Sequence, residues 1–253
     1  MGVWCFRGIG MGLSRSRWRL SGVVNVVDED SDLAQHLSVE ELERARRDAL
    51  ARLVVMETGE GFPPERTPVQ TGALGLLVLE GVVVRSVSVG GRQGLELFGA
   101  GDLVRPFEAA EDLQVMAPAE VRWWALTPTR LAVLDARFTR RMCGYPEVID
   151  QLGGRLERRS SAHALRLTIV QQPRLSTRVH LLLWHLADRF GRVHSEGVVL
   201  PLPLSHELLA QLVGAQRPSV SRALKELERT HVVARRPDGS WWLGAEPPVG
   251  VRR

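Results

Sequence analysis

A short segment near the C-terminus carries the side chains whose chemistry is most specific. Arg222, Lys225 and Arg229 recur at intervals of three and four residues, so on a helix they share one face with Pro218. The opposite face is apolar and consists of Val220, Ala223, Leu224 and Leu227. We therefore predict an amphipathic helix that starts at Arg217 or Pro218, docks through its apolar face and exposes its basic face.

The basic face carries donors that suit nucleic acid. The guanidinium of Arg222 can donate to both O6 and N7 of a guanine in the major groove, whereas Lys225 and Arg229 suit phosphate oxygens. The hydroxyls of Ser219 and Ser221 can bond to either. A solvated face of an ordinary helical hairpin has the same pattern, so the flanking sequence has to distinguish the two interpretations.

Both flanks favour a nucleic-acid reader. Upstream, Ser205 can cap a first helix, and Gly214 can take the positive φ that ends it and starts a sharp turn. Downstream, Val232 to Arg236 and Ser240 to Leu243 read as two strands joined at Pro-Asp-Gly, a turn sequence. Helix, turn, basic helix and β-wing follow one another at close spacing, and this combination is much more specific than the basic helix alone.

The stretch LSHELLAQLVGAQRPSVSRALKELERTHVVARR resembles the winged helix-turn-helix of the Crp/Fnr family of bacterial transcription regulators. The resemblance covers about residues 195 to 243, and Arg217, Arg222 and Lys225 match the pattern of the family's recognition helix. Some members have a glutamate after the first of these arginines, where this chain has Pro218, so the operator sequence does not carry over. The predicted DNA-binding residues are Arg217, Pro218, Ser219, Ser221, Arg222, Lys225 and Arg229.

The middle of the chain reads as short strands. Residues 74–80 and 82–89 are apolar, partly β-branched runs broken at Gly81, Gly90-Gly91 predicts a hairpin, and further strands are expected at 94–98, 121–126 and 130–134. Many short strands with glycine turns predict an antiparallel roll. Together with the predicted winged helix-turn-helix, which we call the reader domain, these strands predict an α+β fold with an N-terminal antiparallel β-roll of the double-stranded β-helix type. The resemblance implies that this roll is the family's cyclic-nucleotide-type domain.

The sequence argues against a cyclic nucleotide in that roll. Family members that bind one follow the turn matched by Gly101-Asp102-Leu103 with a Gly-Glu pair and then an arginine, which hold the ribose and the cyclic phosphate. The matching positions here are Arg105 and Pro106, and Glu108, Glu111 and Asp112 follow, which would repel a phosphate. The ligand-binding residues are unknown, and a regulator gated by cAMP or by another small ligand stays an alternative.

A long helix is expected between roll and reader. Ile149, Leu152 and Leu156 begin an apolar stripe that degrades through Arg159, His163 and Arg166. Such a stripe is often ordinary core, but the resemblance implies a helix that pairs with its copy in a homodimer and places two reader helices about one DNA turn, roughly 34 Å, apart. Pro173 should break it, and Ser176 to Phe190 should form the first reader helix, with Leu181, Leu182, Trp184 and His185 mostly buried.

These elements divide the chain as follows: a disordered tail or an over-extended start at 1–30, the roll at 31–145, the dimerisation helix at 146–172, the winged helix-turn-helix at 173–246 and a tail at 247–253. If the start is over-extended, translation begins near Met11 or within Val23–Val27. Ser38 and Glu41 predict a capping box for a helix from Ser38 through Val55.

Composition excludes several classes. In 253 residues with a net charge of +4, Lys225 is the only lysine, a bias typical of GC-rich coding sequence. The two cysteines, Cys5 and Cys143, are too few for a disulfide framework or a four-thiolate cluster, which fits the reducing cytoplasm. The longest apolar run, 74–84, is too short to cross a membrane.

No enzyme chemistry emerges. Between His36 and His163 there is no histidine, so a metal site in the roll lacks imidazole ligands, and we expect no metal and no cofactor. Haem ligation by His163, His180 or His185 is an alternative to helix packing. We therefore predict a cytoplasmic, homodimeric regulator that binds double-stranded DNA and contacts or obstructs RNA polymerase; a non-specific architectural DNA-binding protein is the rival.

Overall fold

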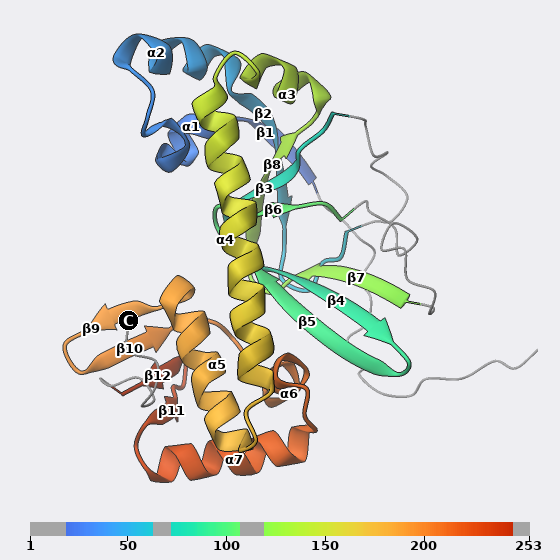
Figure 1. Ribbon diagram of the computed structural model, residues 1–253, viewed down its shortest axis with the longest axis vertical. Helices are drawn as coiled ribbons and strands as arrows, with labels where there is room; N and C mark the ends of the chain where they lie inside the picture. Colours follow the sequence, from blue (N-terminus) through green and yellow to red (C-terminus); the bar gives the residue numbers. More distant parts are fainter. Residues whose placement is uncertain (1–18, 63–71, 107–118, 245–253) are drawn as a thin grey trace, which may run out of the picture.

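The computed structural model describes residues 19–62, 72–106 and 119–244. A β-rich N-terminal part and a helical C-terminal part lie at opposite ends of one long helix, α4 (Figure 1). The described part of the chain thus has the predicted α+β arrangement of roll, long helix and winged helix-turn-helix.

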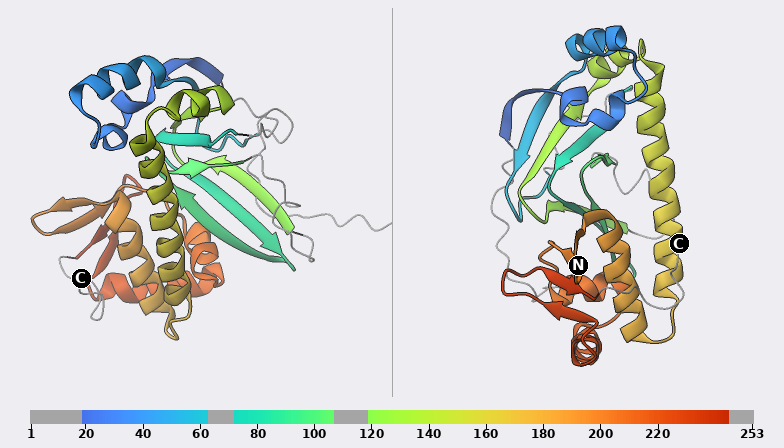
Figure 2. Two further views of the ribbon diagram at one scale, coloured as in Figure 1. Left: turned by 45° about the horizontal axis from the view of Figure 1, so that its top comes forward. Right: turned by 90° about the vertical axis from the view of Figure 1, so that its left-hand side faces the viewer.

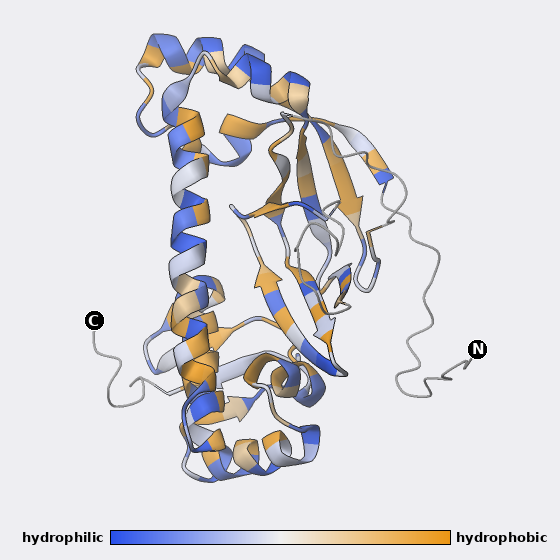
Figure 3. Cartoon of the chain, turned by 45° about the vertical axis from the view of Figure 1, so that its right-hand side comes forward, coloured by the Kyte–Doolittle hydropathy of each residue, from blue (hydrophilic) through white to orange (hydrophobic). Residues whose placement is uncertain are grey.

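Two antiparallel sheets form the roll. The first has the order β1-β2-β8-β3-β6 and the second the order β5-β4-β7. Their bounds are β1 Arg19–Asn25, β2 Leu50–Met56, β3 Gly75–Glu80, β4 Val83–Val89, β5 Arg92–Phe98, β6 Leu103–Val104, β7 Ala119–Ala125 and β8 Thr129–Leu134. The strands predicted from residue 74 onward are therefore confirmed, with shifts of one or two residues at their starts, and the strands are largely hydrophobic (Figure 3).

Glycines stand where the predicted turns need them. Gly90 and Gly91 have φ of 55° and 74° and join β4 to β5, which pair in register from Val83 opposite Phe98 to Val89 opposite Arg92. Gly81 has φ of 85°, and a Cβ at this position would lie 2.2 Å from the carbonyl oxygen of Pro128. Only glycine fits between β3 and β4, since the backbone of the loop before β8 occupies the space of a side chain.

Two N-terminal predictions are wrong. The disordered tail predicted at 1–30, as an alternative to an over-extended start, does not fit residues 19–30, which form β1, the helix α1 (Val26–Glu29) and its C-cap; β1 pairs with β2. Residues 1–18 lie outside the described part. The helix predicted from Ser38 through Val55 ends at Asp48: α2 spans Val39–Asp48, and its predicted capping box is present. The short 3-10 helix η1 (Ser31–Ala34) precedes it in the chain. The remaining residues form β2, because the β-branched run there pairs with β1 and β8 on either side.

Arginines attach α4 to the roll. After α3 (Ala136–Met142), which was not predicted, α4 runs from Pro146 to Val170 as expected. Arg155 forms an ion pair with Asp30 and donates to the carbonyl of Gly101 at 3.2 Å. Arg159 donates to Asp102 at 3.0 Å and forms an ion pair with Glu96. The apolar stripe therefore gives way to charged side chains that bind buried or partly buried carboxylates of the β-rich part.

The C-terminal part is a helical bundle with a small sheet. Its helices are α5 (Leu175–Phe190), α6 (His206–Val213) and α7 (Arg217–Arg229). Its sheet has the order β11-β12-β10-β9, with β9 Arg192–His194, β10 Gly197–Leu200, β11 Val233–Arg235 and β12 Trp241–Leu243. The predicted wing is confirmed as β11 and β12; β9 and β10, which extend it, were not predicted.

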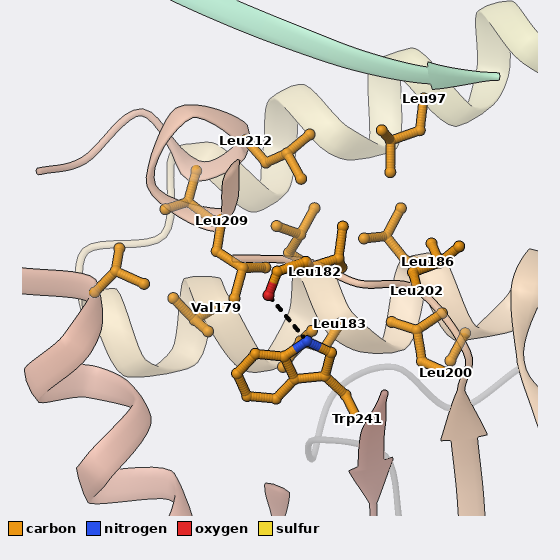
Figure 4. Close-up of a cluster of buried hydrophobic side chains, with 14 of the residues drawn as sticks. Leu97, Val179, Leu182, Leu183, Leu186, Leu200, Leu202, Leu209, Leu212 and Trp241 are labelled. Carbon is orange, nitrogen blue, oxygen red and sulfur yellow. Dashed lines mark hydrogen bonds between the residues drawn. The ribbon is translucent and has the colours of Figure 1, made fainter. Parts of the chain in front are cut away.

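The roll and the helical part share a hydrophobic cluster. Leu95 and Leu97 of β5 belong to the same buried cluster as Leu182 of α5, Leu209 of α6 and Trp241 of β12 (Figure 4). The indole Nε1–H of Trp241 donates to the carbonyl of Leu204 at 3.3 Å, so its polar atom is satisfied although the residue is fully buried. This continuous core fixes the helical part against its own roll.

Substituting Gly81 by alanine tests the close approach at the β3–β4 turn. Gly81→Ala should lower the free energy of unfolding by on the order of 3 kcal/mol, because it adds a backbone clash to the cost of a positive φ. Gly90→Ala, with a positive φ and no atom within 4 Å of its Cβ position, is the matched control and should cost about 1 kcal/mol. Urea denaturation measures both, and equal losses would contradict the proposed clash.

Candidate nucleic-acid interface

The helix-turn-helix is formed by α6, the turn at Gly214 and α7. The Ser205 hydroxyl accepts from the amide of Leu208 at 3.1 Å and caps α6, as predicted. Gly214 has φ of 65° and ψ of 38°, the left-handed conformation that ends α6. Arg178 of α5 holds this turn in place, since it donates to the carbonyls of Val213 at 3.0 Å and Gln172 at 2.8 Å.

Helix α7 lies at the end of the molecule farthest from α2, where it is seen end-on in the right-hand view of Figure 2. It starts at Arg217, with Pro218 in its first turn, as predicted. The residues predicted to dock, Val220, Ala223, Leu224 and Leu227, are all buried. The opposite face is left to solvent in the described part of the chain.

The seven predicted contact residues fall into two groups. Arg217, Pro218, Arg222, Lys225 and Arg229 are exposed. Ser219 and Ser221 are partly buried, and the Ser221 hydroxyl is 2.9 Å from Nδ1 of His206 on α6. This hydrogen bond joins the two helices of the motif, so Ser221 has a structural contact that the sequence pattern did not reveal. The contacts of all seven residues with DNA stay a prediction.

The wing adds cations that were not among the predicted site residues. Arg235 and Arg236 lie on the exposed side of β11 and the turn that follows it. The guanidinium of Arg235 lies 5.7 Å from the ring centre of Trp241, and the charges of Arg235 and Arg217 both act on His206. Arg235 of the wing and Arg217 of the first turn of α7 therefore lie near His206 at the N-terminus of α6. These residues are far apart in the sequence and come together only in the folded protein.

The histidines considered for haem are packed among other groups. His180 is buried and accepts a hydrogen bond from Trp184 Nε1 at 3.1 Å, and His163 lies 3.4 Å from Glu96. Leu182 is buried, whereas Leu181, Trp184 and His185 are only partly buried. In the described residues, no three His, Cys, Asp or Glu side chains are grouped so that they could hold a metal ion.

The described residues include only part of the segment that the sequence compares with cyclic-nucleotide-binding members. Gly101 has φ of 85°, which fits the predicted turn, and Asp102 is buried in contacts with protein groups. Arg122, on β7, pairs with Glu120 at 2.6 Å. Glu108, Glu111 and Asp112 lie outside the described residues.

Within residues 19–62, 72–106 and 119–244, no helix is long and apolar enough to span a bilayer.

Comparison with known proteins agrees with this geometry. Residues 177–241 match the family described as the Crp-like helix-turn-helix domain. A search of curated proteins finds no match for the chain.

Solved structures of similar fold cover most of the chain. A CRP/FNR-family transcriptional regulator from Thermus thermophilus is 23% identical, covers 76% of this chain and 92% of its own, with a TM-score of 0.53. FixK2 from Bradyrhizobium japonicum is 17% identical and covers 76% of this chain and 92% of its own, with a TM-score of 0.56. A cyclic nucleotide-binding domain containing protein from Listeria monocytogenes is 16% identical and covers 76% of this chain and 88% of its own, with a TM-score of 0.60.

The matched helix-turn-helix and the exposed basic face of α7 indicate a DNA-binding transcription regulator, and its β-roll is similar in fold to solved structures that include a cyclic nucleotide-binding domain containing protein. The resemblance predicted from the sequence is confirmed: residues 177–241 match the Crp-like helix-turn-helix domain, and the fold of the described residues is similar to that of solved Crp/Fnr-family regulators.

Three histidines of the reader predict how its stability depends on pH. Burial lowers the pKa of His180, His185 and His206 from the ordinary value of 6.5, and for His206 the charge of Arg235 adds to it. Because the unfolded chain binds protons more readily, the stabilisation is present above about pH 6.5 and is lost as pH falls through the lower pKa values of the folded protein. The urea midpoint should therefore be lower at pH 5.5 than at 7.5.

The variant His180→Gln keeps an acceptor for Trp184 but does not titrate. It should show a smaller fall in the midpoint between the two pH values than the unchanged protein. An equal fall in both proteins would mean that His180 does not contribute to the pH dependence.

Proposed function

We propose that the protein binds palindromic operators as a homodimer, with one α7 of each copy in the major groove. The observation that carries this proposal is the division of α7 into a buried apolar face and an exposed face that presents Arg217, Arg222, Lys225 and Arg229. In a helix-turn-helix, the N-terminal residues of the second helix contact base edges. Arg222 is the residue we assign to a base, Arg217 to a base or a phosphate, and Lys225 and Arg229 to phosphates.

Helix α4 supports the homodimer. Leu156 and Leu167 are 52% and 55% exposed on this helix, although most of the leucines in the described chain are buried. They lie on one stripe with Ile149, at spacings of seven and eleven residues, which two α-helices side by side can bury between them. Paired α4 helices would place the two α7 helices about one DNA turn, roughly 34 Å, apart.

We also propose that DNA binding does not depend on a cyclic nucleotide, because Arg105 and Pro106 replace the Gly-Glu pair that would hold the ribose, and acidic residues follow where an arginine would hold the phosphate. The bound dimer would then contact RNA polymerase or obstruct it, and it would work in the cytoplasm without catalysing a reaction.

In vitro selection of random duplex DNA at physiological salt, without added ligand, tests the proposal. We expect an enriched palindrome whose half-sites lie about one turn apart. No enriched motif, with binding that fades uniformly as salt rises, would contradict sequence-specific binding and favour an architectural protein.

Substitutions on α7 test the individual roles. Arg222→Ala should cost on the order of 1–3 kcal/mol of binding to the selected operator and relax selectivity at one base position. Lys225→Ala should weaken all duplexes about equally and reduce the dependence of binding on salt. Fluorescence anisotropy at several salt concentrations measures both effects.

Arg140→Ala, an exposed arginine of α3 at the other end of the molecule, is the control and should leave binding unchanged. If Arg222→Ala and Lys225→Ala behave alike, the division of roles on α7 is wrong.

A further inference from the structure

A pocket of about 440 Å³ lies where the roll, α4 and the helix-turn-helix domain meet. Its walls come from β5, from the C-terminal half of α4, from α5 and from Leu212 of α6. This volume is in the range of pockets that hold small organic ligands. Arg105 and Pro106, which match the family's Gly-Glu pair at the ribose, are not among the residues that line it.

Most of the wall is apolar. Its large apolar side chains are Leu97, Leu165, Leu182, Leu186, Phe190 and Leu212. Figure 4 shows Leu97 and Leu212 on one side and Leu182 and Leu186 on the other. A ligand that fills this space buries a hydrophobic body against leucine and phenylalanine side chains.

Of the three guanidinium groups in the charged part of the wall, two are bound to carboxylates of the described residues and one is not. Arg159 is bound to Glu96 and Asp102, and Arg189 is bound to Asp102 at 2.5 Å. Arg166 also lines the pocket, but no acceptor in the described residues lies within hydrogen-bond or ion-pair distance of it. Burial lowers the pKa of Arg166, and the charge of Glu96 only partly opposes this effect.

A partly buried arginine without a close acceptor is an unfavourable arrangement, and it becomes favourable when an anion binds. The charge of that anion is limited, because Glu96 and Asp102 offset the charges of Arg159 and Arg189 and leave Arg166 to bind it. The neighbouring arginines cannot compensate, since they already bind carboxylates of the roll.

We propose that this pocket binds a small monocarboxylate with an apolar body, whose carboxylate pairs with Arg166 and whose body packs on the leucines of α5 and α6. The apolar wall disfavours inorganic phosphate, and the single available guanidinium disfavours dicarboxylates.

The position of the pocket couples this ligand to DNA binding. Leu97 belongs to the roll, whereas Leu182, Leu186 and Leu212 belong to the domain that carries α7. A ligand that touches both parts binds one arrangement of roll and reader better than others, and this differential affinity shifts the equilibrium between them. The coupling rests on the proposed function, but the binding of the carboxylate does not.

Calorimetric titration of the purified full chain with octanoate and with 3-phenylpropanoate, in the absence of DNA, tests the binding. We expect both to bind, and we expect octanamide, 3-phenylpropanamide and inorganic phosphate not to bind. Arg166→Gln should weaken carboxylate binding by about tenfold to hundredfold, the loss of a charge-assisted hydrogen bond. Arg158→Gln, an exposed arginine of the same helix that does not line the pocket, should bind like the unchanged protein.

A second variant keeps the test valid if Arg166→Gln does not fold. Ala162→Phe adds bulk to the pocket wall and leaves every charge in place, so it should also weaken binding of both carboxylates. No binding of either carboxylate, equal binding by the amides or phosphate, or unchanged affinity in both pocket variants would overturn the proposal. Repeating the DNA selection with octanoate tests the coupling separately, because ligand binding without an enriched motif would contradict only the proposed DNA function.

Discussion

The carboxylate of Asp102 holds three parts of the molecule together. It accepts from the amide of Gly99 at 2.9 Å, from Arg159 of α4 at 3.0 Å and from Arg189 of α5 at 2.5 Å. A buried charge is tolerated only when it is paired and hydrogen-bonded, and the partners of Asp102 come from the roll, the long helix and the reader domain. Its desolvation is compensated only when all three are assembled, so the placement of α7 relative to the roll depends on this carboxylate. The close fit of Phe190 against Gly99, where a Cβ would lie 2.2 Å from the ring, strengthens the same junction.

Helix α4 uses two kinds of interaction on two faces. Toward the roll, Arg155 binds the partly buried Asp30 and Arg159 binds the buried Glu96, and Arg159 also lies 3.4 Å from the ring centre of Phe98. Burial alone would raise the pKa of Glu96, but Arg159 and then Arg85 outweigh it and hold this pKa below its usual range. Leu156 and Leu167 of α4 are exposed, so a second copy can cover them. Ion pairs and the buried Val148 and Leu152 fix the helix to its own roll, and the exposed leucines leave apolar area for association.

Local patterns predicted much of this architecture. The caps at Ser38 and Ser205, the turn at Gly214 and both faces of α7 depend on neighbours within a few residues, so the sequence shows them directly. The failures have the opposite origin. Strand β2 follows a strong helix signal, and its strand character comes from β1 and β8, which flank it in the sheet. The arginines of α4 interrupt an apolar stripe, and nothing near them in the sequence indicates that Glu96 and Asp102 would bind them. The hydrogen bond between His206 and Ser221 likewise needs the folded helix pair.

The only side-chain amine of this protein is on α7. Lys225 is the single lysine of the chain, and it is exposed on the basic face of that helix. The other basic side chains in the domain are guanidinium or imidazole groups, which acylating reagents attack far less readily than an amine. Any chemistry directed at lysine side chains, such as acetylation or attachment of a fluorophore, is therefore confined to one position on this surface. Acetylation there removes one positive charge from α7 and leaves the ion pairs at the junction of roll and reader untouched.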